Sequence, residues 1–151
     1  MRCRSGVSVM KHSIMAMAVA AILSGGASAA TTQAEVNEAL RANPDIYNGL
    51  FTAALIYHIS KTCPDIRPPG RLARVSYFLS LYNRARGMGF DRTQIEAFVE
   101  DDVEKARMQA LVDRHLQQAG VSDPYSKTEV CEFARAQMAE RTALGRQLTE
   151  R

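Results

Sequence analysis

The sequence predicts an all-α protein, a small bundle of four main helices plus a short N-terminal helix, stapled by one disulfide. Three observations support this fold class. Apolar residues recur at the spacing of a helix face, helix caps and stops separate these segments, and no segment alternates apolar and polar residues as a half-buried strand does. The length of 151 residues fits a single domain.

The first 29 residues have the three-part pattern of a secretory signal peptide. Three basic residues precede an uncharged apolar run over residues 14–23, and the small residues Ala-Ser-Ala follow at 27–29. A membrane anchor is the alternative, although this run is shorter than the roughly 20 residues that span a bilayer. Met10 is a second candidate for the translation start. We therefore expect residues 1–29 to be a signal peptide.

Cleavage is expected between Ala29 and Ala30, which leaves residues 30–151 as one helical domain in the periplasm. Three of the 19 Lys and Arg residues lie before position 30, and none of the 16 Asp and Glu residues does, so the expected mature chain has 16 of each. A strongly basic chain would suggest nucleic acid or an anionic membrane as partner. The balanced charge removes that support. In the arginine-rich segment 71–86, Tyr77 and Arg84 fit a protein contact better.

The central helix is predicted over residues 44–62, and the other helices are expected to pack around it. Asn43 fits its N-cap and Pro44 its first position. Within it only Asp45 and Lys61 are formally charged, and a helix that is apolar over most of its circumference is usually covered on several sides. The stripe that we expect to be buried contains Tyr47, Phe51, Leu55 and Ile59.

The other helices are bounded by caps and glycine stops. We expect a short helix over residues 33–42 and main helices over 71–86, over 92–119 and from about 127 onward. Their caps are Thr32, Asp91 and Ser126, each followed three residues later by Glu or Gln as in a capping box. Gly87 and Gly120 end two of them, because glycine accepts the left-handed conformation that closes helices.

The same periodicity predicts which residues point inward. On the helix over 71–86 they are Leu72, Val75, Phe78, Leu79 and Tyr82. On the helix over 92–119 they are Ile95, Phe98, Val99, Val103, Ala106 and Ala110. On the last helix they are Val130, Phe133, Ala134, Met138, Leu144 and Leu148.

Two cysteines remain after the expected cleavage, because Cys3 leaves with the signal peptide. A pair of cysteines in an exported chain is typical of one disulfide, here between Cys63 and Cys131. Two buried free thiols are the alternative.

Asp102 is the main candidate for a polar site, because it projects onto the predicted apolar stripe of the helix over 92–119. A buried carboxylate needs a partner. Three arginines on the preceding helix could supply it: Arg71, Arg74 and Arg86. Such a pair would either join the two helices or form a pocket that binds a ligand near His58. The neighbouring acidic residues are interpreted as a solvated face: Glu100, Asp101 and Glu104.

No sequence pattern indicates a catalytic residue, a cofactor or a metal. Zinc, haem and metalloprotease motifs, nucleophile elbows and phosphate-binding glycine loops are all missing from the sequence. His58 lies among apolar residues of the central helix, where a histidine usually bonds a carbonyl or hydroxyl group.

Four segments carry a resemblance to a known family. They are T-C-P at 62–64, S-Y-F-L-S-L-Y-N-R-A-R-G-M-G-F at 76–90, I-E-A-F-V-E-D-D-V-E-K-A-R at 95–107 and Glu129-Val130-Cys131. With these segments the chain resembles an uncharacterised family of small exported alphaproteobacterial helical proteins, a domain of unknown function. The resemblance supports the helical fold and the paired cysteines, and it implies no substrate.

The function expected from these features is that of a periplasmic, non-enzymatic interaction or assembly module. Its partner would be another periplasmic or membrane protein, and not nucleic acid. The alternative is a small-molecule-binding protein or weak hydrolase with a polar pocket near His58 and Asp102.

Overall fold

In this computed structural model the described residues are 31–151. The expected signal peptide, the cleavage between Ala29 and Ala30, and Cys3 lie outside them. The described part is mostly helical, as predicted. The helices are α1 (Gln33–Ala42), α2 (Pro44–Thr62), α3 (Arg71–Gly87), α4 (Arg92–Glu100), α5 (Asp102–Gln118), α6 (Lys127–Ala139) and the 3-10 turn η1 (Gly145–Gln147). Two short strands, β1 (Ile66–Arg67) and β2 (Thr149–Glu150), pair antiparallel.

The predicted caps are present. Complete capping boxes begin α1 at Thr32 and α4 at Asp91, and the Asn43 side chain accepts from the first turn of α2. Ser126 caps α6, but its predicted partner Glu129 does not bond back to it. The Glu129 carboxylate instead accepts from the backbone N–H groups of the loop before the helix. Local sequence therefore sets most helix starts.

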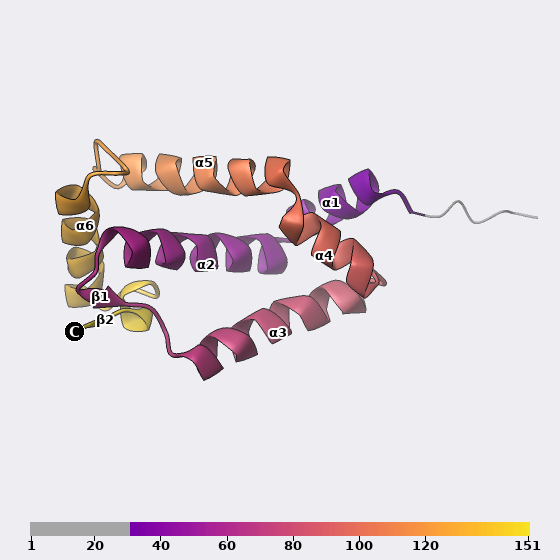
Figure 1. The fold of residues 1–151 in the computed structure, drawn as a ribbon, viewed down its shortest axis with the longest axis horizontal. Coiled ribbons are helices and arrows are strands. Elements are labelled where there is room, and N and C mark those ends of the chain that lie inside the picture. The colour runs from indigo at the N-terminus through magenta and orange to yellow at the C-terminus, as the bar shows by residue number, and fades with distance from the viewer. Residues whose placement is uncertain (1–30) are drawn as a thin grey trace, which may run out of the picture. The chain divides into compact units, whose positions relative to one another are not determined.

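Helix α2 is the centre of the fold, as predicted. It contacts α1, α3, α5 and α6, and Figure 1 shows it running between α5 and α3. Leu55 and Ile59 are buried, whereas Tyr47 and Phe51 on the same stripe are half-buried. One core cluster surrounds the C-terminal half of α2, and a second joins its first turns to α1 and α4. Tyr57, on another side of α2, is exposed.

A disulfide between Cys63 and Cys131 ties the end of α2 to α6, as predicted, with the sulfur atoms 2.06 Å apart. Both cysteines are buried in the cluster around the C-terminal half of α2. Among residues 31–151, no helix has the length and apolar character that a membrane-spanning segment requires.

The single helix predicted over 92–119 is wrong, because the chain forms two helices there. At Asp101 the backbone is extended, with φ −62° and ψ 121°, and the side chain accepts from the N–H groups of Val103 and Glu104. Asp101 is thus an N-cap that starts a new helix. The predicted inward face holds only as far as Phe98, while Val99, Val103, Ala106 and Ala110 are exposed.

The inward face predicted for α3 is also wrong in its N-terminal half. Leu72, Val75, Phe78 and Leu79 are exposed, and the buried residues of this helix are Leu81 and Ala85. Helix α3 crosses α2 at Gly49, where the Tyr77 hydroxyl donates to the Gly49 carbonyl over 3.0 Å. A Cβ on Gly49 would lie 2.6 Å from a methyl group of Leu81, so the two helices approach closely at this point.

The last predicted helix ends early, at Ala139, and no strand was predicted after it. Arg141 has a φ of 52°, and the chain then turns through η1 into β2. A Cβ on Gly145 would lie 1.9 Å from the Gln137 carbonyl oxygen, so this return against α6 requires glycine. Leu148 is buried, as predicted, but it reaches the core from an extended segment.

Candidate functional site

Asp102 does not lie where the sequence placed it. Its side chain is 95% exposed and pairs with Lys105 on the same helix at 3.1 Å. The reason is the break at Asp101, because a new helix begins there and the residues of the old apolar stripe turn outward. Asp102 is therefore a solvated residue of the first turn of α5, where a carboxylate suits the helix dipole.

The three arginines proposed as its partners are also on the surface. Arg71, Arg74 and Arg86 are exposed, and within residues 31–151 none of them forms an ion pair. Arg86 donates to the backbone carbonyl of Phe90 at 2.8 Å. These arginines give α3 a positive surface that has no counter-charge on its own helix.

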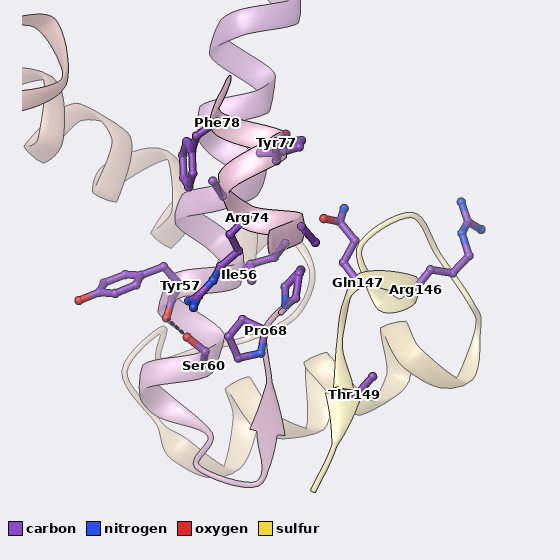
Figure 2. A pocket seen from close by; sticks show the side chains of 13 residues that line it. Ile56, Tyr57, Ser60, Pro68, Arg74, Tyr77, Phe78, Arg146, Gln147 and Thr149 are labelled. Atoms are coloured by element: carbon purple, nitrogen blue, oxygen red, sulfur yellow. Dashed lines mark hydrogen bonds between the residues drawn. The ribbon is translucent and has the colours of Figure 1, made fainter. Parts of the chain in front are cut away.

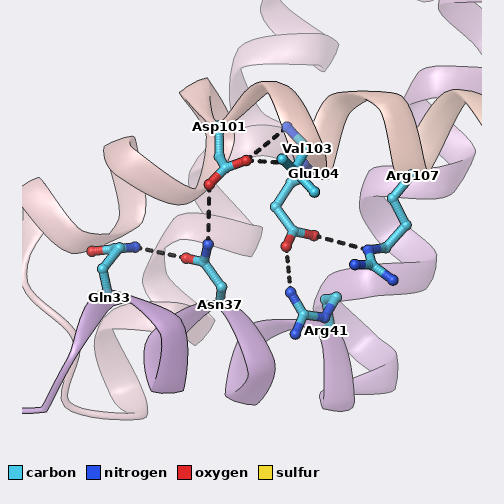
Figure 3. Close-up of polar contacts among 7 residues, drawn as sticks. All are labelled: Gln33, Asn37, Arg41, Asp101, Val103, Glu104 and Arg107. Atoms are coloured by element: carbon cyan, nitrogen blue, oxygen red, sulfur yellow. Dashed lines mark hydrogen bonds and ion pairs between the residues drawn. The ribbon is translucent and has the colours of Figure 1, made fainter.

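The buried carboxylate of this region is Glu104, which the sequence analysis had assigned to a solvated face. It pairs with Arg41 of α1 and, at 3.7 Å, with Arg107 (Figure 3). Its Oε2 atom and the nearby Tyr47 hydroxyl have no hydrogen-bond partner among the described residues. Burial, and then the charge of Glu104, raise the pKa of Tyr47. The expected ion pair between Asp102 and an arginine of α3 is therefore wrong, and the buried ion pair of this region joins α1 to α5.

A series of side-chain hydrogen bonds beside this ion pair joins α1 to Asp101, the residue between α4 and α5. Gln33 donates to the Asn37 side chain over 2.7 Å, and Asn37 donates to Asp101 over 3.4 Å (Figure 3). The sequence did contain a signal for this arrangement. Asp101 followed three residues later by Glu104 fits the capping-box spacing, which marks a helix start inside the predicted long helix.

His58 is buried and its Nε2 atom lies 2.7 Å from the Pro124 carbonyl oxygen. Because a carbonyl oxygen only accepts, this contact assigns the proton to Nε2. His58 thus joins α2 to the loop after α5, whereas Asp102 begins α5. Helix α5 has 17 residues, so about 25 Å separates its two ends. The structure does not bring His58 and Asp102 into one pocket.

The most unusual surface feature is the N-terminal half of α3. Leu72 is 85% exposed, and Val75, Phe78 and Leu79 are about half exposed. We refer to these four residues as the α3 apolar face. Large apolar side chains grouped on one exposed helix commonly mark an interaction site.

The N-terminal half of α3 borders a groove of about 550 Å³, which we call the C-terminal groove because residues near the C-terminus also line it. It is lined mainly by apolar side chains of α2, α3 and the Pro68-Pro69 segment, and by residues near the C-terminus. Arg74 and Arg146 are the charged side chains in its lining. Figure 2 shows Arg74 reaching over α2 toward Tyr57 and Ser60, whereas Arg146 points away. Arg74 is the residue among the sequence candidates that lines this groove.

The C-terminal half of α3 borders a smaller groove of about 280 Å³, which we call the acidic groove. Its apolar lining includes Phe78 and Tyr82 of α3 and Val99 of α4. Its charged lining residues are Glu96 and Glu100. Phe78 lines both grooves, which therefore adjoin along α3.

Within residues 31–151, no three His, Cys, Asp or Glu side chains are grouped so that they could hold a metal ion.

Residues 38–149 match a family described as a family of unknown function, DUF5333. No curated protein and no solved structure matches the chain. The family match includes both cysteines, all of α3 and every residue that lines the two grooves.

Proposed function

We propose that this chain, which belongs to the DUF5333 family of unknown function, is a non-enzymatic interaction or assembly module that works in the periplasm. Its partner in this proposal is another periplasmic or membrane protein. The export of the family, and its place among alphaproteobacterial proteins, belong to the same proposal.

The observation that carries the proposal is the α3 apolar face. Exposing four large apolar side chains on one helix is unfavourable in water. Burying a fully exposed side chain of this kind contributes roughly 1.5–3 kcal/mol, and a half-exposed one contributes about half of that. Leu72 is 85% exposed and contributes nothing to the core described above. A binding partner that covers this face would recover part of that free energy.

The periplasmic setting is supported by two features. One is the signal-peptide pattern of residues 1–29. The other is the disulfide between Cys63 and Cys131, since such bonds persist in oxidising compartments.

Photo-crosslinking in cells tests the proposal. A benzoylphenylalanine residue is placed at Leu72, and the matched control carries it at Tyr125, which is also exposed but lies in the loop before α6. We expect a discrete protein adduct from position 72 and none from position 125. If neither position gives an adduct, or both give the same one, the α3 apolar face is not the interaction surface.

Binding of a small amphiphile is the second candidate function, and the C-terminal groove favours it. An apolar lining with arginines as its charged residues suits a molecule with an apolar tail and an anionic head. No histidine and no acidic residue lines this groove, so within it Ser60 has no base that would activate it for hydrolysis. Titration of the protein with decanoate would reveal saturable binding that Arg74→Gln weakens.

A further inference from the structure

The charges on α3 are all of one sign. The helix contains four arginines and no acidic residue. Arg84 pairs with Asp45 of α2 at 2.7 Å, but within residues 31–151 Arg71 has no ion-pair partner. Arg71 lies one, two and three helical turns before Val75, Phe78 and Tyr82, so it shares a stripe with the α3 apolar face and with the wall of the acidic groove.

The acidic groove carries negative charge on its rim, opposite in sign to the charge of α3. Glu96 and Glu100 are its charged lining residues, and both are exposed. Glu96 pairs with Arg92, whereas Glu100 forms no ion pair within residues 31–151. Between the two glutamates the groove presents Val99, which is about half exposed. An apolar ridge with a positive charge at its end would fit this groove in both polarity and charge.

The same chain carries such a ridge, because the α3 apolar face begins beside Arg71. The two complementary surfaces are continuous, since Phe78 belongs to the apolar face and also lines the acidic groove. Within one copy, Arg71 and Leu72 lie outside the lining of the acidic groove, so they do not fill it. In a pair of copies, the α3 apolar face of each can fill the acidic groove of the other.

We infer that the protein forms a symmetric homodimer in which the two α3 helices cross antiparallel near Val75. Leu72 of each copy enters the acidic groove of the other beside Phe78 and Val99, and Arg71 of each copy pairs with Glu100 of the other. Each contact occurs twice around a twofold axis, which closes the assembly. The inference rests on the proposed function, in that the α3 apolar face must be an interaction surface, and it names a second copy as the occupant.

Charge complementarity favours a second copy over an anionic membrane. A membrane surface would attract Arg71 but repel Glu96 and Glu100 on the adjoining rim. A second copy supplies both signs in the required places. The pair also buries the exposed valine of α4, which a flat lipid surface beside α3 would leave uncovered.

A charge-exchange experiment tests the pairing between Arg71 and Glu100. Both side chains are exposed and neither forms an ion pair within residues 31–151, so Arg71→Glu and Glu100→Arg should fold normally. Sedimentation equilibrium of the purified, oxidised protein gives the dimer dissociation constant. Each single variant places like charges opposite each other twice in its homodimer, and we expect that constant to rise at least about tenfold.

Mixing the two variants should restore the dimer. In the mixed pair, one contact has its charges exchanged and the other is native, so both are attractive. The double variant Arg71→Glu/Glu100→Arg should also recover the dimer by itself. Arg114→Glu makes the same charge change at an exposed residue of α5 and should leave the dissociation constant unchanged. Tyr57→Ser, at an exposed residue of α2 that lines the C-terminal groove, should also leave it unchanged.

The outcomes separate this inference from the proposed function. A wild-type protein that stays monomeric, or a dimer that the mixture of variants does not restore, overturns the homodimer. In that event a heterologous adduct at position 72 in cells still supports the interaction module. A monomer that also gives no adduct at position 72 refutes both.

Discussion

Replacing the buried carboxylate of Glu104 should destabilise the fold, and the structure indicates by how much. The Glu104 side chain is only 8% exposed, whereas the side chains of its partners Arg41 and Arg107 are 27% and 51% exposed. Removing one partner of a buried ion pair typically costs about 3–5 kcal/mol. In Glu104→Gln the amide keeps the volume and one acceptor, and the arginines left behind can reach water. We therefore expect a smaller loss of about 2–3 kcal/mol, just below that range.

Replacing the partner Arg41 should lower the free energy of unfolding by more. Arg41→Gln leaves the Glu104 carboxylate buried with only the longer contact to Arg107, so the full loss of about 3–5 kcal/mol applies. The double variant Arg41→Gln/Glu104→Gln should lose less than the sum of the single losses, since neither charge is then left alone.

Urea unfolding followed by circular dichroism measures these differences. The matched control is Glu96→Gln, which removes an exposed carboxylate paired with Arg92 and should change the free energy of unfolding by less than about 1 kcal/mol. For a domain of this size, the loss in Glu104→Gln corresponds to a decrease in Tm of about 8–12 °C. If Glu104→Gln costs no more than the control, the account of a buried clamp between α1 and α5 is refuted.

Three further predictions concern the staple, the C-terminal turn and the loop before α6. Replacing Cys63 and Cys131 together with serine should lower the free energy of unfolding by about 4 kcal/mol, because the bond closes a long loop, and an unchanged urea midpoint would contradict this. Gly145→Ala should destabilise strongly, because its Cβ would meet the backbone of α6, whereas Gly70→Ala faces open space and serves as the control in thermal unfolding. Hydrogen bonds from the Ser122 hydroxyl, and then from backbone N–H groups of the same loop, hold the pKa of Glu129 below its ordinary value of 4.5. The stabilising contribution of Glu129 is therefore present above pH 4.5 and is lost as the pH falls through the lowered pKa. Glu129→Gln should flatten that part of the profile of Tm against pH, and an unchanged profile would contradict the assignment.

Much of the fold could be predicted because its signals are local. A cap depends on a side chain and the backbone three residues ahead, which is why Thr32, Asn43 and Asp91 were identified correctly. The burial of α2 followed from its lack of charge, and the disulfide from the two cysteines that remain after the expected cleavage.

The errors have a common physical cause. Periodicity shows which residues share a face of a helix, but it does not show whether another element covers that face. The predicted α3 stripe has helical spacing, yet Leu72 at its start is 85% exposed. The single extended residue Asp101 starts a new helix, which presents a different face to the core. As a result Glu104 is buried and Asp102 is exposed, the reverse of the prediction.

The region now proposed to carry function could not be predicted for the same reason. The sequence predicts a polar pocket, whereas the residues now proposed to carry function are apolar residues of α3 whose helical spacing predicts that they are buried. Arg71 and Arg74 were identified as candidates, but as partners of a buried carboxylate rather than as surface charges beside exposed side chains.

Hydroxyl-radical footprinting of the α3 apolar face tests the central claim most directly. In the dilute, monomeric protein Leu72, Phe78 and Leu79 should be modified heavily, since all three are exposed. At high protein concentration, or inside cells, the account predicts that their modification falls severalfold while that of Tyr125 stays constant. Equal modification of Leu72 under all conditions would show that nothing covers this face and would contradict the account.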